Sequence, residues 1–79
     1  MNRRELKDVL QKEGIRSDMY DLDSGHESER YTIRESHGVW DVYYSERGLE
    51  SGNRKFLNES DACEYLLRAL RQDPSSRAR

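Results

Sequence analysis

The side chains with the most potential for chemistry in this 79-residue chain are two histidines, one cysteine and sixteen carboxylates. A metal site needs three or four His, Cys or carboxylate ligands at short, compatible spacings, whereas His26, His37 and Cys63 stand singly. We therefore interpret both histidines as turn residues. The spacing of Cys63 from Leu66 and Leu70 places it beside the apolar stripe of a helix, which predicts a core cysteine rather than an exposed nucleophile.

An acidic segment resembles the opening of a calcium loop. It runs from Asp21 to Gly25, but the twelfth position is Thr32 and not the glutamate that such a loop requires. Other carboxylate pairs are plentiful, yet a general acid needs a concave site that desolvates one member, and a domain this short has little room for one. The sequence therefore predicts no enzymatic activity, no metal site and no cofactor.

Composition predicts a folded domain with a highly charged surface. Hydrophobic residues make up 33% of the chain and charged residues 38%, but five Tyr, one Trp and one Phe supply large burial per residue. We expect one domain over residues 1–73, because Pro74 forbids continuation of the last helix. Residues 74–79 are predicted to be a disordered tail.

The net charge and the single cysteine limit the cellular compartments and the classes of partner that we expect. The formal net charge is −2, whereas binding to a phosphate backbone usually needs a clear basic excess, so nucleic acid is disfavoured. Cys63 has no second cysteine to pair with, and the stretch from Met1 to Arg16 is charged where a signal peptide would be apolar. The chain has no apolar run long enough to span a membrane. These features predict a soluble, cytoplasmic protein.

The first helix is predicted from Asn2 to Glu13. Asn2 can cap its first turn, and Glu5, three residues later, completes a capping box. Gly14 stands where a left-handed residue ends a helix.

The second helix is predicted to begin after Asn58, with Asp61 at the third position and Leu57 and Ala62 spaced for a hydrophobic staple. Its apolar residues recur at helical spacing, which indicates a buried stripe. They are Ala62, Tyr65, Leu66, Ala69 and Leu70.

Between the helices the sequence alternates as half-buried strands do. Strands are predicted over Arg30–Glu35, Val39–Ser45 and Arg54–Leu57, with a short extended piece over Met19–Leu22. The fold class is therefore α+β, with an N-terminal helix, a three- to four-stranded antiparallel meander and a C-terminal helix. Both helices are expected on one face of the sheet.

Two surfaces are candidates for binding a partner. The first is the loop over 17–29, whose candidate residues are Asp18, Tyr20, Asp21, Asp23 and Glu27. It carries five carboxylates and no Lys or Arg. The second is the turn after the second long strand, with candidates Glu46, Arg47 and Glu50 and the neighbouring Tyr43. If Trp40 and Tyr44 face the core, Tyr43 faces outward, where it either shields the sheet or contacts a partner.

The element order is that of the double-stranded-RNA-binding domain, but the charges differ. That family has a lysine cluster at the start of its last helix, where this chain has Asn58, Glu59, Ser60 and Asp61. A nucleic-acid-binding accessory module remains the alternative, using the outward sheet face. Its cations would be Arg30, Arg34, Arg47, Arg54 and Lys55. A homo-oligomer joined through an exposed sheet edge is a third reading, although we expect a monomer.

One resemblance adds a specific candidate. The run from Val39 to Gly48, which includes Tyr-Tyr-Ser-Glu-Arg-Gly, followed by Phe56 and by Asp61 to Leu67, resembles small bacterial immunity proteins. These accompany secreted polymorphic toxins, including those of contact-dependent growth inhibition systems. The resemblance covers roughly residues 20–70 and fixes no binding residue. It implies a cytoplasmic protein that neutralises a cognate toxin encoded by a neighbouring gene, often a nuclease, through charge complementarity and aromatic anchors.

Overall fold

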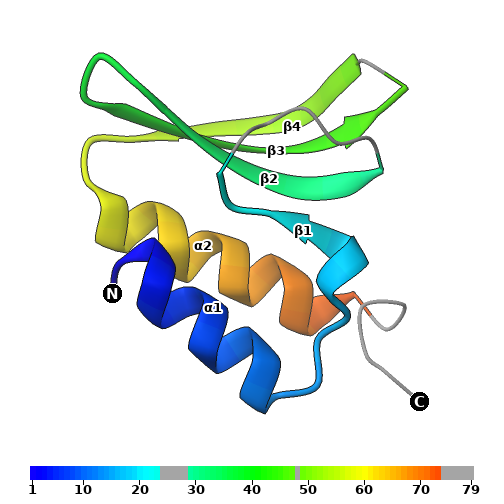
Figure 1. The fold of residues 1–79 in the computed structure, drawn as a ribbon. Coiled ribbons are helices and arrows are strands. Elements are labelled where there is room, and N and C mark those ends of the chain that lie inside the picture. The colour runs from blue at the N-terminus through cyan, green and yellow to red at the C-terminus, as the bar shows by residue number, and fades with distance from the viewer. Residues whose placement is uncertain (24–28, 48, 74–79) are drawn as a thin grey trace.

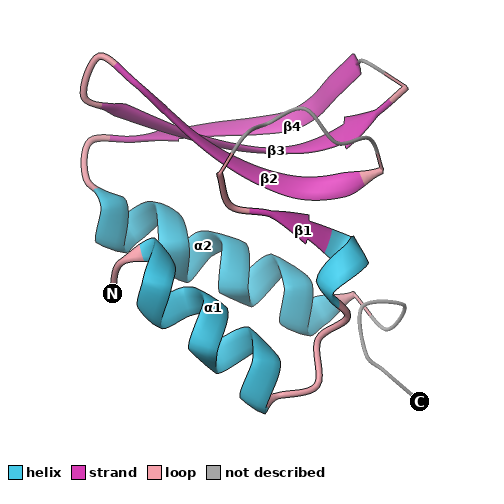
Figure 2. Ribbon diagram, in the orientation of Figure 1, coloured by secondary structure: helices cyan, strands magenta, loops and turns pink. Residues whose placement is uncertain are grey.

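The computed structural model describes residues 1–23, 29–47 and 49–73 and shows an α+β architecture in two layers (Figure 1). Helices α1 (Arg3–Lys12) and α2 (Glu59–Gln72) lie on the same face of a four-stranded sheet (Figure 2). The predicted fold class is confirmed. The predicted tail, 74–79, lies outside the described residues.

The sheet has the order β1-β2-β3-β4 and is mixed, not wholly antiparallel as predicted. Its strands are β1 (Tyr20–Asp21), β2 (Arg30–Ser36), β3 (Val39–Glu46) and β4 (Leu49–Phe56). The β2–β3 and β3–β4 pairs are antiparallel, whereas β1 runs parallel to β2. The chain between β1 and β2 is much longer than a hairpin turn, so β2 can start beside β1 and run in the same direction.

Helix α1 begins and ends on the predicted signals. The side chain of Asn2 accepts a bond from the backbone N–H of Glu5 at 2.8 Å, and the Glu5 carboxylate accepts one from the N–H of Asn2 at 2.9 Å. Gly14 has a φ of 74°, and the N–H of Ile15 donates back to the carbonyl of Leu10 at 3.0 Å. The capping box and the glycine ending are therefore confirmed.

Helix α2 is capped as predicted, but the staple across its start is absent. The side chain of Asn58 accepts a bond from the N–H of Asp61 at 2.8 Å. Leu57 is 86% exposed, whereas Ala62 is fully buried in the core, so the two side chains do not shield each other. That part of the prediction was wrong because Ala62 belongs to the core between helix and sheet.

Strand β4 begins at Leu49, five residues earlier than predicted. The stretch before Arg54 contains Gly48 and Gly52, a residue type that is typical of hairpin turns. Instead, Gly52 sits within the strand at a φ of 66°, beside a shift in register between Val42 and Tyr44. A glycine at positive φ is therefore part of a bulge that lets β4 continue.

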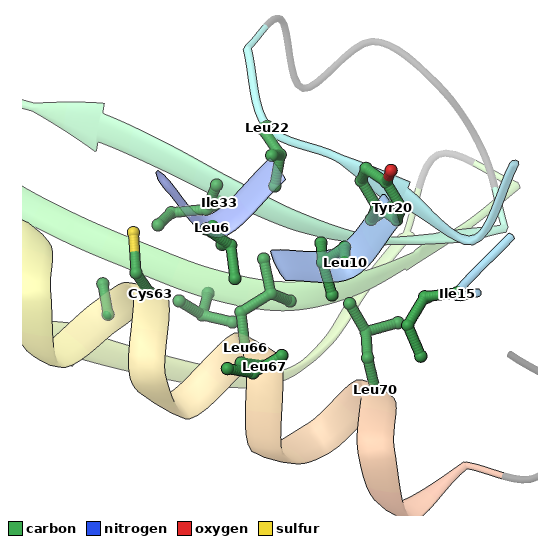
Figure 3. Packing of buried hydrophobic residues seen from close by; sticks show 12 residues of the cluster. Leu6, Leu10, Ile15, Tyr20, Leu22, Ile33, Cys63, Leu66, Leu67 and Leu70 are labelled. Atoms are coloured by element: carbon green, nitrogen blue, oxygen red, sulfur yellow. The ribbon is translucent and has the colours of Figure 1, made fainter. Parts of the chain in front are cut away.

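The core lies between the sheet and both helices (Figure 3). Leu6 and Leu10 of α1 and Leu66 and Leu70 of α2 are fully buried there with Ile33 of β2. Cys63 belongs to this cluster, as its spacing predicted, together with Val42, and Trp40 packs against it.

Candidate functional site

Tyr43 lies on the outward face of the sheet, the face away from the helices, but it is not displayed there. Its side chain is only 3% exposed, and the guanidinium of Arg34 lies over its ring at 5.0 Å from the centroid. Burial raises the pKa of Tyr43, and the nearby Arg34 partly opposes that rise. The prediction of an exposed aromatic contact is therefore wrong, because an arginine from the neighbouring strand covers the ring.

Two cations of the outward face, Arg34 and Lys55, are paired with carboxylates. Oδ2 of Asp41 lies 3.3 Å from Nζ of Lys55 and 3.6 Å from a guanidinium nitrogen of Arg34. Arg34 also lies 3.1 Å from Glu50, whose carboxylate accepts a bond from Asn53 at 2.9 Å. Asp41 is 6% exposed, and its Oδ1 has no hydrogen-bond partner among the described residues. This network neutralises two of the arginine and lysine side chains expected to contact nucleic acid.

Replacing Arg34 with alanine is expected to lower the free energy of unfolding by roughly 1–3 kcal/mol. The change removes the stacking on Tyr43 and takes one cation away from the buried carboxylate of Asp41. Urea-induced unfolding measures the loss. Arg54→Ala is the matched control, because Arg54 is exposed on β4, and it should change stability by less than about 0.5 kcal/mol. Equal stability of both variants would contradict a role for the network.

A cleft of about 560 Å³ lies at the end of the sheet where β2 starts and β3 ends. We call it the tyrosine cleft. Its apolar walls come from Met19, Tyr31 and Tyr44. Its charged lining consists of Asp18, Glu29 and Asp73 together with Arg16 and Arg30.

The two tyrosines that line this charged site are in contact with each other. Tyr31 and Tyr44 are paired across β2 and β3, and their rings meet edge to face with centroids 5.1 Å apart. The hydroxyl of Tyr31 donates to Oδ2 of Asp73 at the end of α2, at 3.0 Å. Burial and this bond to a carboxylate both raise the pKa of Tyr31. The bond fixes the ring between sheet and helix.

Carboxylates from different segments surround Tyr44. Burial raises the pKa of Tyr44, and the negative charges of Glu29, Glu46 and Asp73 raise it further. Glu29 precedes β2, Glu46 ends β3 and Asp73 follows α2. Three separate segments therefore each contribute a carboxylate near this phenol.

The arginines of the cleft have partners of their own. Arg16 is bound to Asp18 at 2.7 Å, and Arg30 donates to the carbonyl of Ser17 at 3.4 Å. The lining therefore holds three carboxylates and two guanidiniums, and Glu46 adds a fourth carboxylate near Tyr44. The site has a net negative charge.

The two predicted surfaces meet at this end of the sheet. Arg30 pairs with Ser45 in the antiparallel register, which brings the segment that carries Asp18 close to the turn that carries Glu46. Asp18, Glu46 and Arg47 are exposed there. The antiparallel pairing of these strands was predicted, but the bond from Arg30 to the carbonyl of Ser17, which ties the first segment to this end of the sheet, had no signal in the sequence.

The remaining predicted residues lie elsewhere. Tyr20 is 7% exposed and packs in the core, so its assignment to a binding surface was wrong. Asp21 is also buried, and its carboxylate accepts a bond from the N–H of the exposed Asp23 at 3.1 Å. Glu50 is committed to Arg34 on the outward face. Glu27 lies outside the described residues.

Most of the cleft was not predicted. The binding candidates did not include Arg16, Met19, Tyr31, Tyr44 or Asp73, and Glu29 belongs to the predicted acidic loop without being a named candidate. A signal was present for the tyrosines, because each occupies a core-side position near the end of its strand and has a glutamate two positions away in sequence. Asp73 gave no such signal, because its bond to Tyr31 joins residues 42 positions apart.

Neither helix of the described part of the chain is long and apolar enough to cross a membrane. Across residues 1–23, 29–47 and 49–73, no three His, Cys, Asp or Glu side chains group into an arrangement that could hold a metal ion. Comparison with protein-family models found no match, and neither curated proteins nor solved structures gave one.

Proposed function

We propose that this chain is an immunity protein that binds and neutralises a cognate bacterial toxin encoded by a neighbouring gene. The observation that carries the proposal is the tyrosine cleft, whose lining places carboxylates from separate segments beside two tyrosines in edge-to-face contact. Tyrosine is enriched among the residues that dominate binding energy at protein interfaces. A negative surface of this kind complements a basic partner and favours rapid association with it.

The chemistry of the partner follows from the charge of the cleft. A toxin that acts on nucleic acid carries a basic active site, and an acidic protein surface can occupy that site in place of phosphate. A nuclease toxin is therefore the proposed target. Inhibition of this kind requires a rigid scaffold and complementary charge but no catalytic step by the inhibitor.

The alternative, a nucleic-acid-binding module, is less well supported. It requires a cationic outward face, but Arg34 and Lys55 on that face are paired with Asp41 and Glu50. No observation on the described residues favours it over protein binding.

The test is binding to the polypeptide encoded by the neighbouring gene. The purified chain should capture that polypeptide and protect cells that express it. Replacing Glu29 and Glu46 together with glutamine should weaken the complex at least roughly tenfold in calorimetric titration, because charged contacts that become buried in an interface contribute strongly to affinity. Failure to capture the polypeptide and to protect cells would sink the proposal.

A matched control distinguishes the effect of charge at the cleft from the effect of the net charge of the chain. Asp8→Asn combined with Glu64→Gln removes the same number of charges from exposed positions on the two helices. This variant should bind the partner as the parent does. If both double variants lose affinity equally, net charge and not the cleft determines binding.

A further inference from the structure

Strand β4 forms one edge of the sheet, the edge opposite β1 (Figure 1). Among the described residues, β3 is the only strand that pairs with it, and residues 49–55 are all exposed. An edge strand of eight residues presents a row of backbone N–H and C=O groups that can pair with a further strand. The side chains of β4 indicate which strand that is.

A bulge divides β4 into two halves. Two residues, Gly52 and Asn53, stand opposite the single residue Tyr43 of β3. Along a regular strand, side chains an odd number of positions apart lie on opposite faces. The extra residue of the bulge reverses this alternation between the two halves. Glu50 and Lys55, five positions apart, therefore share a face of the sheet.

The pairing with β3 places these two charged residues on the outward face. Lys55 is opposite Asp41, and Glu50 is opposite Ser45, four positions further along β3. Both belong to the network of that face, in which Lys55 contacts Asp41 and Glu50 contacts Arg34. The side chain of Lys55 is still 69% exposed, and Glu50 is exposed as well. Each of them can therefore face a further charge beyond the edge.

Apolar residues occupy the helix side of β4 at its two ends. Phe56 is opposite Trp40 and packs against the core. Leu49 is opposite Glu46, six positions from Trp40 on β3 and therefore on the same face. Its side chain is 74% exposed. The two ends of β4 thus match each other, with one apolar residue on the helix side and one charge on the outward side, and the two charges have opposite signs.

We propose that two copies of the chain pair through β4 as an antiparallel dimer with two-fold symmetry. With the symmetry axis at the bulge, Glu50 of each copy faces Lys55 of the other, and Leu49 of each copy faces Phe56 of the other. Symmetry makes every such pair occur twice. Opposite charges directly across an antiparallel pair stabilise it, and covering Leu49 removes apolar area from water. This inference goes beyond the proposed function, does not depend on it and departs from the monomer expected from the sequence.

The faces of the side chains select this register. A shift by one residue would place Glu50 opposite Arg54, which are also opposite charges. Arg54, however, is opposite the buried Val42 and therefore lies on the helix side, whereas Glu50 lies on the outward side. Residues directly opposite each other in an antiparallel pair share a face. The shifted register therefore cannot bring these two charges together.

Two features that commonly protect an edge strand do not oppose this dimer. Lysine on an edge repels a second copy where lysine faces lysine, but here each Lys55 faces a Glu50. A bulge disrupts a ladder locally, but this one lies on the symmetry axis. The three residues on either side of it, 49–51 and 54–56, are in regular register with β3. They can form two short ladders with the second copy.

The test is sedimentation velocity of the full chain at low and at high concentration. A ladder along one strand with its flanking side chains makes a small interface, for which we expect a dissociation constant of the order of 10–100 µM. The chain should therefore sediment as a monomer at about 1 µM and mainly as a dimer at about 1 mM. A monomer at both concentrations would overturn the inference, and so would assembly beyond a dimer.

Charge reversal tests the pairing itself. Glu50→Lys and Lys55→Glu each place like charges opposite each other twice, so each variant alone should dimerise at least roughly tenfold more weakly than the parent chain. An equimolar mixture of the two variants restores both opposite-charge pairs and should form a heterodimer with about the affinity of the parent. A structural defect in either variant would not be repaired by mixing. Two folded variants that stay monomeric when mixed would refute the register.

A measurement on the parent chain does not depend on how the variants fold. Two-dimensional NMR at low and at high concentration should show shifts concentrated in the amides of β4. Shifts confined to other elements would mean that another surface associates, and the assignment to β4 would be wrong.

Lys7→Glu is the matched control, because it makes the same charge change as Lys55→Glu at an exposed position on α1. This variant should dimerise as the parent chain does. If Lys7→Glu and Lys55→Glu weaken the dimer equally, the association responds to overall charge and the proposed pairing fails.

Discussion

Replacing Leu66 with alanine is expected to lower the free energy of unfolding by about 2–5 kcal/mol. Leu66 belongs to α2, is 0% exposed and points toward the sheet. The apolar side chains of both helices surround it (Figure 3). The truncation loses buried methyl groups and leaves a cavity that a two-layer domain cannot close without moving a helix. Native domains are stable by about 5–15 kcal/mol, and a chain of this size has a thin core. The variant should therefore be partly unfolded at 37 °C.

Urea-induced unfolding followed by circular dichroism measures this effect. Leu57→Ala is the matched control, because Leu57 is 86% exposed at the end of β4, and its stability should change by less than about 0.5 kcal/mol. A loss below 1 kcal/mol in the Leu66 variant would contradict the described packing of α2 on the sheet.

The parts of the fold that were predictable are those set by short-range chemistry. The capping box of Asn2 and Glu5, the left-handed Gly14 and the cap at Asn58 each depend on residues within a few positions. The alternation along β2 and β3 likewise places successive side chains on opposite faces. Local sequence was therefore sufficient for the helices and the two longest strands.

The errors arose where distant residues decide the environment. Tyr20 follows the loop after α1, yet pairing of β1 with β2 directs it into the core. Tyr43 was correctly assigned to the outward face, but Arg34 from the neighbouring strand covers it. Alternation predicts the face of a residue, whereas exposure depends on what other strands place over it.

In the candidate site, too, the features set by neighbouring residues were predictable and those set by distant residues were not. The two acidic segments were recognisable from composition, but their meeting around Tyr31 and Tyr44 depends on the register of β2 with β3 and on the end of α2. The sign of the surface charge was therefore predictable from composition, whereas the tyrosines beside which the carboxylates lie were not.

The free energy of unfolding is expected to fall as the pH rises above 9. Cys63 is the first group responsible, because its thiol titrates at a lower pH than the buried tyrosines do in the unfolded chain. The thiol is fully buried, and burial raises its pKa from 9.0 to about 11. Below pH 9 the thiol is protonated in both folded and unfolded chains and has no effect on the pH dependence. Between pH 9 and 11 only the unfolded chain releases this proton, so unfolding becomes progressively more favourable. The expected loss is about 1.4 kcal/mol at pH 10 and about 2–3 kcal/mol in total.

Unfolding in urea at pH 8 and pH 10 tests this, with Cys63→Ala as the comparison. The variant lacks the thiol but keeps the tyrosines, of which Tyr20, Tyr31 and Tyr43 have pKa values raised by burial and add to the loss above pH 10. Its decrease from pH 8 to pH 10 should therefore be smaller by about 1.4 kcal/mol than that of the parent chain. The difference between the two pH-dependent decreases reports on the thiol alone, because the packing cost of Cys63→Ala lowers the free energy of unfolding equally at pH 8 and at pH 10. Parallel pH profiles would mean that the thiol of Cys63 reaches solvent in the folded chain, and the packing of α2 against the sheet would have to be looser than described.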